Sequence, residues 1–209
     1  MKFHMRAVAV SAAAFAFGLF LAASPAAAEC DPDTALFEDD FAFEDLSWEY
    51  GDNFYVEDGK AVIKEYAGVV NFQTQNEGAN VCVDMTIEDV SDVPGSAIGL
   101  VFWWQDWDNF YEMFYWADGW LEVRRFIKGK KVTILSEESL ALKKGAGATN
   151  HVEIDLGQKD ATLYINGTEI GRFKGKQPKD GGVVGLYGAS SADQPATFSF
   201  DNLIVSDTE

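Results

Sequence analysis

Residues 101–120 read VFWWQDWDNFYEMFYWADGW, and ten of these twenty side chains are aromatic. Two apolar runs of strand length are separated by the polar segment around Asp106, Trp107 and Asp108. Aromatic and β-branched runs of this length, separated by Asp and Asn, predict two β-strands joined by a turn. A soluble chain gathers a third of its aromatic residues here, which is more than one face of a core requires.

The same pattern continues on both sides of this stretch. From residue 36 onward, short runs rich in β-branched and aromatic residues alternate with Gly, Asn, Asp or Pro. No segment after the first 28 residues shows a sustained helical period of apolar residues. The sequence therefore predicts an all-β sandwich or barrel. The strand-like segments are 53–66, 80–87, 96–104, 109–116, 120–127, 130–135, 151–156, 161–167, 168–173, 181–188 and 196–205.

The dipeptide Asn166-Gly167 lies between two of these segments. Asn-Gly is the pair most favoured in a two-residue type I′ hairpin turn, so the sequence predicts a hairpin there. The tripeptide that continues to Thr168 is also a glycosylation sequon. We prefer the turn interpretation.

The N-terminus has the order of a secretory signal peptide. Lys2 and Arg6 precede an apolar stretch, which ends in small residues at Ala28. This order predicts a signal peptide over residues 1–28 and a mature chain of residues 29–209, long enough for a single domain. No second long apolar run follows, so we expect an exported protein, periplasmic or secreted, without a membrane span.

Charge and cysteine content narrow the possible partners. The formal net charge is −18, which disfavours nucleic acid and anionic membrane surfaces. Cys30 and Cys82 are the two cysteines, and an oxidising compartment would allow them to form a disulfide or leave them unpaired. Only His151 remains after the predicted cleavage, which excludes zinc sites built on several histidines.

Side-chain alternation divides the aromatic region into two sets, one for each face of the strands. The first set suits a core: Ile98, Leu100, Phe102, Tyr111, Met113, Tyr115, Leu121 and Val123. The second set mixes rings with charges that would be costly in a core: Trp103, Phe110, Glu112, Phe114, Trp116, Trp120, Glu122, Arg124 and Phe126. The second set therefore predicts a solvent-facing surface.

Such a surface suits a sugar ligand, because indole rings pack on the C–H faces of sugars while charged groups bind the hydroxyls. The stacking candidates are Trp103, Phe114, Trp116 and Trp120, with Trp107 at the rim. Glu112, Glu122 and Arg124 are the hydrogen-bonding candidates. The alternative is that this set forms a second, occluded cluster, or that a β-bulge reverses the parity.

Several segments together resemble a known superfamily. They are LFEDDF, VEDGKAVI, GLVFWWQDWDNFYEMF, HVEIDLGQKDATLYINGTEIGRF, GGVVGLYG and FDNLIV. In this order they are similar to the concanavalin A-like lectin/glucanase superfamily, especially its laminin G-like and 3-keto-disaccharide hydrolase-type domains. The resemblance implies a jelly-roll sandwich of two antiparallel sheets, with ligands on the concave sheet.

The resemblance also raises the possibility of catalysis. Family 16 glycoside hydrolases carry Glu-x-Asp-x-x-Glu on one strand, but here Glu153 and Asp155 are followed by Gln158. The missing carboxylate removes the retaining mechanism, which needs two. We therefore predict that Glu153 and Asp155 form a solvated strand face, and that His151 begins a strand.

A second catalytic candidate is Glu112. It matches the glutamate of the 3-keto-disaccharide hydrolase-type domains, where a strand arginine precedes a Tyr-Glu pair. Trp103 or Trp104 occupies the arginine position here, and Arg124 is the possible substitute. Whether the protein is an enzyme therefore stays open, with the incomplete motifs favouring a binding domain.

The superfamily resemblance implies a structural calcium ion as well. The matching oxygen donors are Asp39 or Asp40, the carbonyl of Gly59, and Asp201. Three hypotheses follow for the whole chain: a glycan-binding domain, a glycosidase-like hydrolase at the same face, or a domain whose aromatic surface binds another protein.

Overall fold

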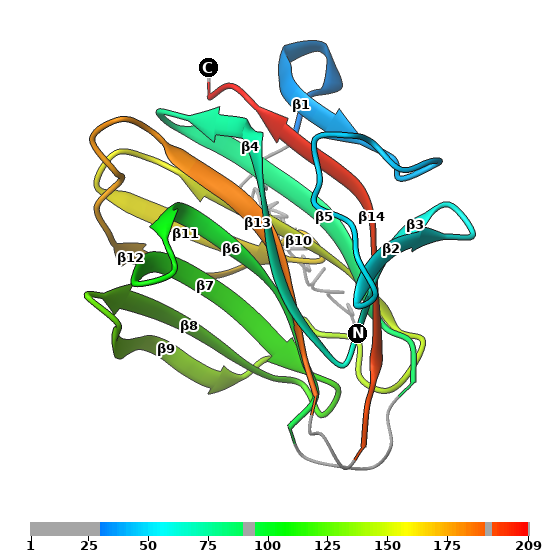
Figure 1. Ribbon diagram of the computed structural model, residues 1–209. Coiled ribbons are helices and arrows are strands. Elements are labelled where there is room, and N and C mark those ends of the chain that lie inside the picture. Colours follow the sequence, from blue (N-terminus) through cyan, green and yellow to red (C-terminus); the bar gives the residue numbers. More distant parts are fainter. Residues whose placement is uncertain (1–29, 90–94, 191–193, 209) are drawn as a thin grey trace, which may run out of the picture.

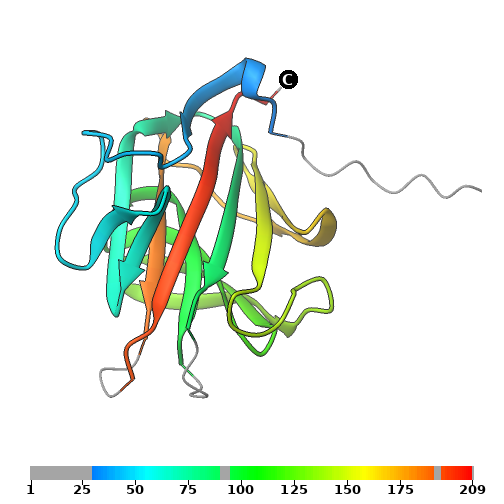
Figure 2. The same ribbon diagram turned by 90° about the vertical axis from the view of Figure 1, so that its right-hand side faces the viewer.

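The computed structural model describes residues 30–89, 95–190 and 194–208, which form two antiparallel β-sheets packed face to face (Figures 1 and 2). The predicted signal peptide, residues 1–28, lies outside these ranges. A search of the same ranges finds no helix of the length and hydropathy needed to cross a membrane. The predicted all-β jelly-roll sandwich is confirmed.

One sheet has eight strands and faces the viewer in Figure 2, with the red strand β14 near its middle. A 3₁₀ turn at Pro32–Thr34 precedes its first strand. Seven strands lie side by side, each hydrogen-bonded to the next across the sheet, and the eighth strand, β1, pairs with β14. In sheet order the seven are β12 (Thr168–Lys174), β11 (Asp160–Ile165), β10 (Thr149–Leu156), β5 (Ala79–Ile87), β14 (Thr197–Ser206), β3 (Lys60–Lys64) and β2 (Phe54–Glu57), while β1 is Ala35–Asp39.

The second sheet has six strands and contains the aromatic region. Its centre is the antiparallel set β6–β7–β8, flanked by β13 and β9. In sheet order the strands are β4 (Tyr66–Asn76), β13 (Gly182–Ala189), β6 (Ala97–Asp106), β7 (Asn109–Trp116), β8 (Trp120–Ile127) and β9 (Lys130–Glu138).

The core lies between the two sheets. The predicted core set from β6, β7 and β8 is buried there together with side chains from β5, β10, β11 and β14. Tyr115 also anchors one sheet to the other, because its hydroxyl donates a 2.8 Å hydrogen bond to the carbonyl of Met85 on β5. Burial of this apolar surface is the main favourable contribution to the free energy of folding.

Strand β14 changes neighbour along its length. Residues Thr197–Phe200 pair with β3, whereas Leu203–Ser206 pair with β1. The change occurs at Asn202, which has a φ of 53° and lies within a register shift against β5. A β-bulge of this kind bends the strand, and here it allows two short strands to share one edge of β14.

The hairpin predicted at Asn166-Gly167 is confirmed. These residues join β11 to β12 with φ values of 49° and 75°, the left-handed backbone that a type I′ turn requires. The Asn166 side chain also donates to the carbonyl of Ala141 and to Asn150 Oδ1. The turn residue therefore holds a neighbouring loop in addition to reversing the chain.

Strand β4 is the main element that the predicted segments leave out. Its sequence, YAGVVNFQTQN, lacks a clean alternation, and its burial is irregular because it is an edge strand with a register shift against β13. Asn71 and Thr74 are nevertheless fully buried, and Thr74 Oγ1 accepts a 2.8 Å hydrogen bond from the Val184 amide.

The predicted disulfide is confirmed. Cys30 and Cys82 are bonded, with Cα atoms 6.1 Å apart and a sequence separation of 52. The bond attaches the chain segment before β1 to β5 in the middle of the eight-stranded sheet.

We expect removal of this disulfide to destabilise the fold. Closing a loop of this length is worth about 2–4 kcal/mol, mostly by restricting the unfolded chain. The double variant C30A/C82A should therefore lose about that much free energy of unfolding in urea titrations. A reductant should lower the stability of the wild type and leave the double variant unchanged; equal stability of oxidised and reduced wild type would contradict the prediction.

Candidate functional site

The candidate site is the outer side of the six-stranded sheet, called here the aromatic face: Tyr66, Gly68, Gly99, Trp107, Phe110, Glu112, Phe114, Trp116, Trp120, Glu122, Arg124, Phe126, Ser136 and Tyr187. The strand register brings its centre together. Glu112 lies opposite Arg124 on β8, and Phe114 lies opposite Gly99 on β6 and Glu122 on β8. The predicted second set is therefore one continuous surface, with the exception of Trp103.

The assignment of Trp103 to this face is wrong. Its φ is 47°, and the pairing of β6 with β7 shifts between Phe102 and Asp106, so a bulge interrupts the alternation. The side chain is 1% exposed and joins the core, with its ring edge-on to Tyr111 at 4.9 Å between centroids. It fills the space beside Gly175, where a Cβ would collide with the indole ring.

The centre of the aromatic face is closed by its own side chains. Glu112 is 4% exposed and Phe114 only 2%, so the prediction that these two residues face solvent is wrong. The Arg124 guanidinium lies over the Phe114 ring, 4.2 Å from its centroid, and Trp116 packs edge-on against the same ring at 4.8 Å. The alternative of an occluded cluster therefore describes this central part.

A chain of polar contacts runs across the closed centre into β9. Arg124 Nε lies 2.6 Å from Glu122 Oε2, and its Nη1 lies 3.7 Å from Glu112 Oε1. Ser136 donates to Glu122 Oε1, and the Trp120 indole N–H donates to Ser136 Oγ, both at 3.1 Å. Each predicted hydrogen-bonding residue is therefore already engaged by another. Ser136 joins them, although no sequence pattern marks it as a site residue.

Burial shifts the pKa of Glu112. Removal from solvent raises the pKa of its carboxyl above the usual range, and this exceeds the opposing attraction of Arg124. The pKa of the neighbouring Tyr187 is raised to about 12, first by burial and then by the charge of Glu112. A carboxyl with a raised pKa has the property of a general acid, but Glu122, the other carboxylate of the aromatic face, is held by Arg124.

Exposed rings lie at the rim of the aromatic face. Trp120 is 42% exposed, Trp107 is 48% exposed, and Tyr66 is more exposed than either. Tyr66 packs edge-on against Tyr187, with 6.0 Å between centroids. These rings are accessible to a ligand, whereas the centre is closed. Tyr66 and Tyr187 join the site through β4 and β13, outside the aromatic segment 101–120.

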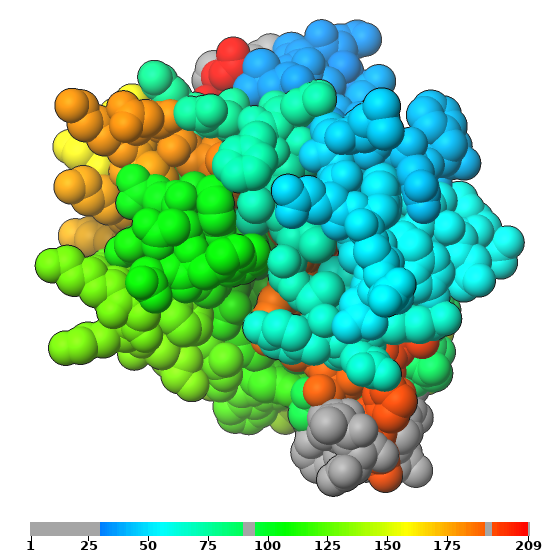
Figure 3. Space-filling model, in the orientation of Figure 1, coloured from blue at the N-terminus to red at the C-terminus, as the bar shows by residue number. Residues whose placement is uncertain are grey.

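Trp107 has the rim position predicted for it. It lies in the β6–β7 turn, which Asp106 stabilises by accepting hydrogen bonds from the Asp108 amide and the Asn109 side chain. The indole covers Gly68 of β4, where a Cβ would lie 3.0 Å from its Cη2 atom. Figure 3 shows the green segment that contains this turn beside the turquoise β4.

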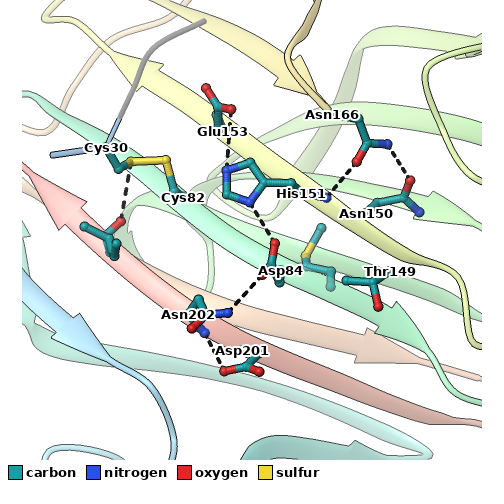
Figure 4. A network of polar contacts seen from close by, with 12 residues as sticks. Cys30, Cys82, Asp84, Thr149, Asn150, His151, Glu153, Asn166, Asp201 and Asn202 are labelled. Carbon is teal, nitrogen blue, oxygen red and sulfur yellow. Dashed lines mark hydrogen bonds and ion pairs between the residues drawn. A yellow bond between two sulfur atoms is a disulfide. The ribbon is translucent and has the colours of Figure 1, made fainter. Parts of the chain in front are cut away.

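Glu153 and Asp155 lie on the other sheet, on strand β10. The prediction of a solvated face is wrong for Glu153, which is buried beside His151, with its Oε1 3.4 Å from His151 Nε2 (Figure 4). Burial also raises the pKa of Asp155, with Arg172 opposing the rise. The strand beginning predicted at His151 is close to the observed start of β10 at Thr149.

His151 is the centre of a polar network on the eight-stranded sheet that also contains Asp84, Glu153 and Asn202. Its Nδ1 lies 2.7 Å from Asp84 Oδ1, and the Asn202 side-chain Nδ2 donates to Asp84 Oδ2 at 3.0 Å (Figure 4). Glu153 is paired across the strands with Cys82 of the disulfide. This network joins β5, β10 and β14, and it cannot combine with Glu112, which belongs to the opposite sheet.

The donors implied for calcium are partly engaged within the protein. Asp40 accepts a hydrogen bond from the Ala42 amide, and Asp39 accepts from the Phe41 amide and the Trp48 indole. Burial raises the pKa of Asp201, and the charges of Asp84 and Asp40 raise it further. In the part of the chain described here, no three His, Cys, Asp or Glu side chains converge as a metal site. The donor set with the Gly59 carbonyl therefore stays a prediction.

We expect Glu112→Gln to change the pH dependence of stability. A carboxyl with a raised folded-state pKa stabilises the fold while protonated, and this contribution is lost as the pH rises through that pKa. E112Q, which mimics the protonated form, should match the wild type at pH 3.5. At pH 7 it should be more stable by about 1.4 kcal/mol per unit of pKa elevation.

Urea unfolding at the two pH values measures this difference. The matched control is Glu169→Gln, which removes an exposed carboxylate of β12 in the other sheet. If E112Q were the less stable protein at pH 7, the attraction between Glu112 and Arg124 would outweigh the cost of burial.

Comparison with known proteins adds fold neighbours. No family model matches the sequence, and no curated protein matches it. Among solved structures, the carbohydrate binding module CBM66 from Bacillus subtilis is 15% identical, with a TM-score of 0.55 over 77% of this chain and 91% of that chain. Bacillus licheniformis beta-glucanase is 10% identical, with a TM-score of 0.61 over 82% and 98% of the two chains.

The catalytic domain of an endo-1,3-beta-glucanase from Thermotoga petrophila is likewise similar. It is 10% identical, with a TM-score of 0.62 over 84% of this chain and 98% of that chain. These similarities span nearly the whole sandwich at very low identity, so they establish architecture. The chain has the concanavalin A-like jelly-roll fold that the sequence resemblance implied.

Proposed function

We propose that this protein is an exported glycan-binding domain that uses the rim of its aromatic face. The observation that carries the proposal is the group of exposed rings, Trp107, Trp120 and Tyr66, around a rigid polar centre on one sheet. Rigid aromatic rings beside hydrogen-bonding groups are the combination that sugars require, because sugars have both C–H faces and hydroxyls. The similarity of fold to a carbohydrate binding module and to glucanases supports the same class of ligand.

Export is part of this proposal. The predicted signal peptide over residues 1–28 is supported by the Cys30–Cys82 disulfide, because structural disulfides persist in oxidising compartments such as the periplasm or the extracellular space. The net charge of −18 keeps such a protein dispersed and disfavours nucleic acid as a partner.

The hydrolase alternative rests on Glu112, whose raised pKa suits a general acid. Glycoside hydrolysis also needs a second carboxylate at a defined separation, and Glu122 is bound by Arg124. We therefore favour binding over catalysis. Release of reducing sugar by the wild type, abolished in E112Q with the fold intact, would reverse this choice.

A glycan array with the mature chain, residues 29–209, tests the proposal. The array is run with calcium and with a chelator, so that a contribution of Asp40, Gly59 and Asp201 is visible. We expect binding to at least one glycan, weakened about tenfold or more by Trp120→Ala, because truncating an aromatic anchor removes much of a binding energy. Phe43→Ala is the matched control, since Phe43 is exposed outside both sheets and should not matter.

Two results would contradict this expectation. A folded protein that binds no glycan would exclude the lectin function and leave the aromatic face as a protein contact or an occluded structural cluster. Equal loss of binding in the Trp120 and Phe43 variants would place the ligand elsewhere.

A further inference from the structure

A cavity of about 600 Å³ opens where three connections meet, away from the centre of the aromatic face. The connections are the β4–β5 turn, the β10–β11 turn and the segment between β12 and β13. Its volume is within the range of pockets that bind small ligands. We call it the lysine pocket, and its lining residues are Glu77, Gln158, Lys159, Lys174, Gly175, Lys176, Gln177, Pro178 and Lys179.

The charge of this pocket is opposite to that of the protein. Four lysines line it, out of 16 lysines and arginines in a chain with a net charge of −18, and Glu77 is its one acidic residue. Over the described ranges, no carboxylate lies within 4.0 Å of any of the four amino groups, whereas Lys60 and Lys144 do form ion pairs. The pocket therefore concentrates unpaired positive charge.

Hydrogen bonds hold the walls of the pocket in place. The Gly175 amide donates to the carbonyl of Lys159 at 2.9 Å, which joins the β12–β13 segment to the β10–β11 turn. The buried Gln177 side chain donates to the carbonyl of Asn76 at 2.8 Å, which joins the same segment to the end of β4. Trp103 packs behind Gly175. The cavity is thus preformed and does not depend on a flexible loop closing.

We propose that the lysine pocket binds the carboxylate or sulfate groups of an acidic polysaccharide. Ammonium groups with no partner in the protein attract such anions, and a preformed cavity reduces the entropic cost of binding. The remaining negative charge of the protein disfavours long polyanions such as nucleic acid, so the expected ligand is a short acidic stretch of a polysaccharide that one pocket can hold.

Strand β4 connects this pocket to the proposed binding face. It begins at Tyr66 on the aromatic face and ends at Asn76, next to Glu77 of the pocket wall. An extended polymer is the ligand whose shape can follow this strand. The choice of a glycan rests on the function proposed above, whereas the preference for an anion rests on the pocket alone.

Calorimetric titration with a short oligogalacturonate and with its neutral methyl ester tests the proposal on the mature chain. We expect the acidic form to bind at least tenfold more tightly than the ester, with the difference decreasing as salt is added. The pocket variant K174Q/K176Q should lose this preference. K130Q/K143Q, which removes two exposed lysines outside the pocket, changes the net charge equally and should retain it.

The possible failures are distinguishable. Binding of neither form, by a protein with unchanged circular dichroism, overturns the glycan function together with this inference. Equal binding of both forms overturns only the lysine pocket, as does an equal effect of the two double variants. Amide chemical shifts provide a readout that does not depend on the variants, and the acidic form should change those of Lys159 and Gly175. Inorganic sulfate is the competitor: if it displaces the acidic form at equal charge concentration, the pocket is a site for free anions instead.

Discussion

The antiparallel register of β6, β7 and β8 is the constraint on which this structure depends. Along β7, every second side chain enters the core and every other one reaches the aromatic face. A slip of one residue would exchange Met113 with Glu112 and place a carboxylate between the sheets. The pairing that builds the core is therefore also what places Glu112 beside Arg124 and Phe114 beside Glu122.

Arg124 then determines the character of the outer surface. Its guanidinium covers Phe114 and contacts Glu122, so one side chain both seals a ring from water and occupies an acceptor. Arginine suits this role because its plane stacks on aromatic rings while its edge binds carboxylates. The result is a buried, hydrogen-bonded centre surrounded by accessible rings. Because its side chains are already held in place, a ligand would bind to this surface with a small loss of side-chain entropy.

The sequence was sufficient for the fold and for much of the aromatic face, because alternation, aromatic content and turn residues point to the same answer in β5 to β8 and β10 to β14. Alternation failed at Trp103, where a local bulge turns the side chain into the core. Side-chain alternation predicts which face Glu112 and Phe114 lie on, but not that Arg124 from the neighbouring strand covers them. The lysine pocket combines three turns distant in sequence, so only the sheet order could reveal it.

The bulge at Asn202 has a consequence for how the chain folds. Because β14 pairs with β1, β3 and β5, the final strand of the sandwich is the element that ties the earliest segments together. Until Ser206 has left the ribosome, β1 and β3 lack the edge on which they assemble. The nascent chain therefore lacks its complete eight-stranded sheet until β14 is available, and such long-range pairing makes folding slow. Late completion of the fold is compatible with the export proposed above, because the eight-stranded sheet forms only after β14 is available.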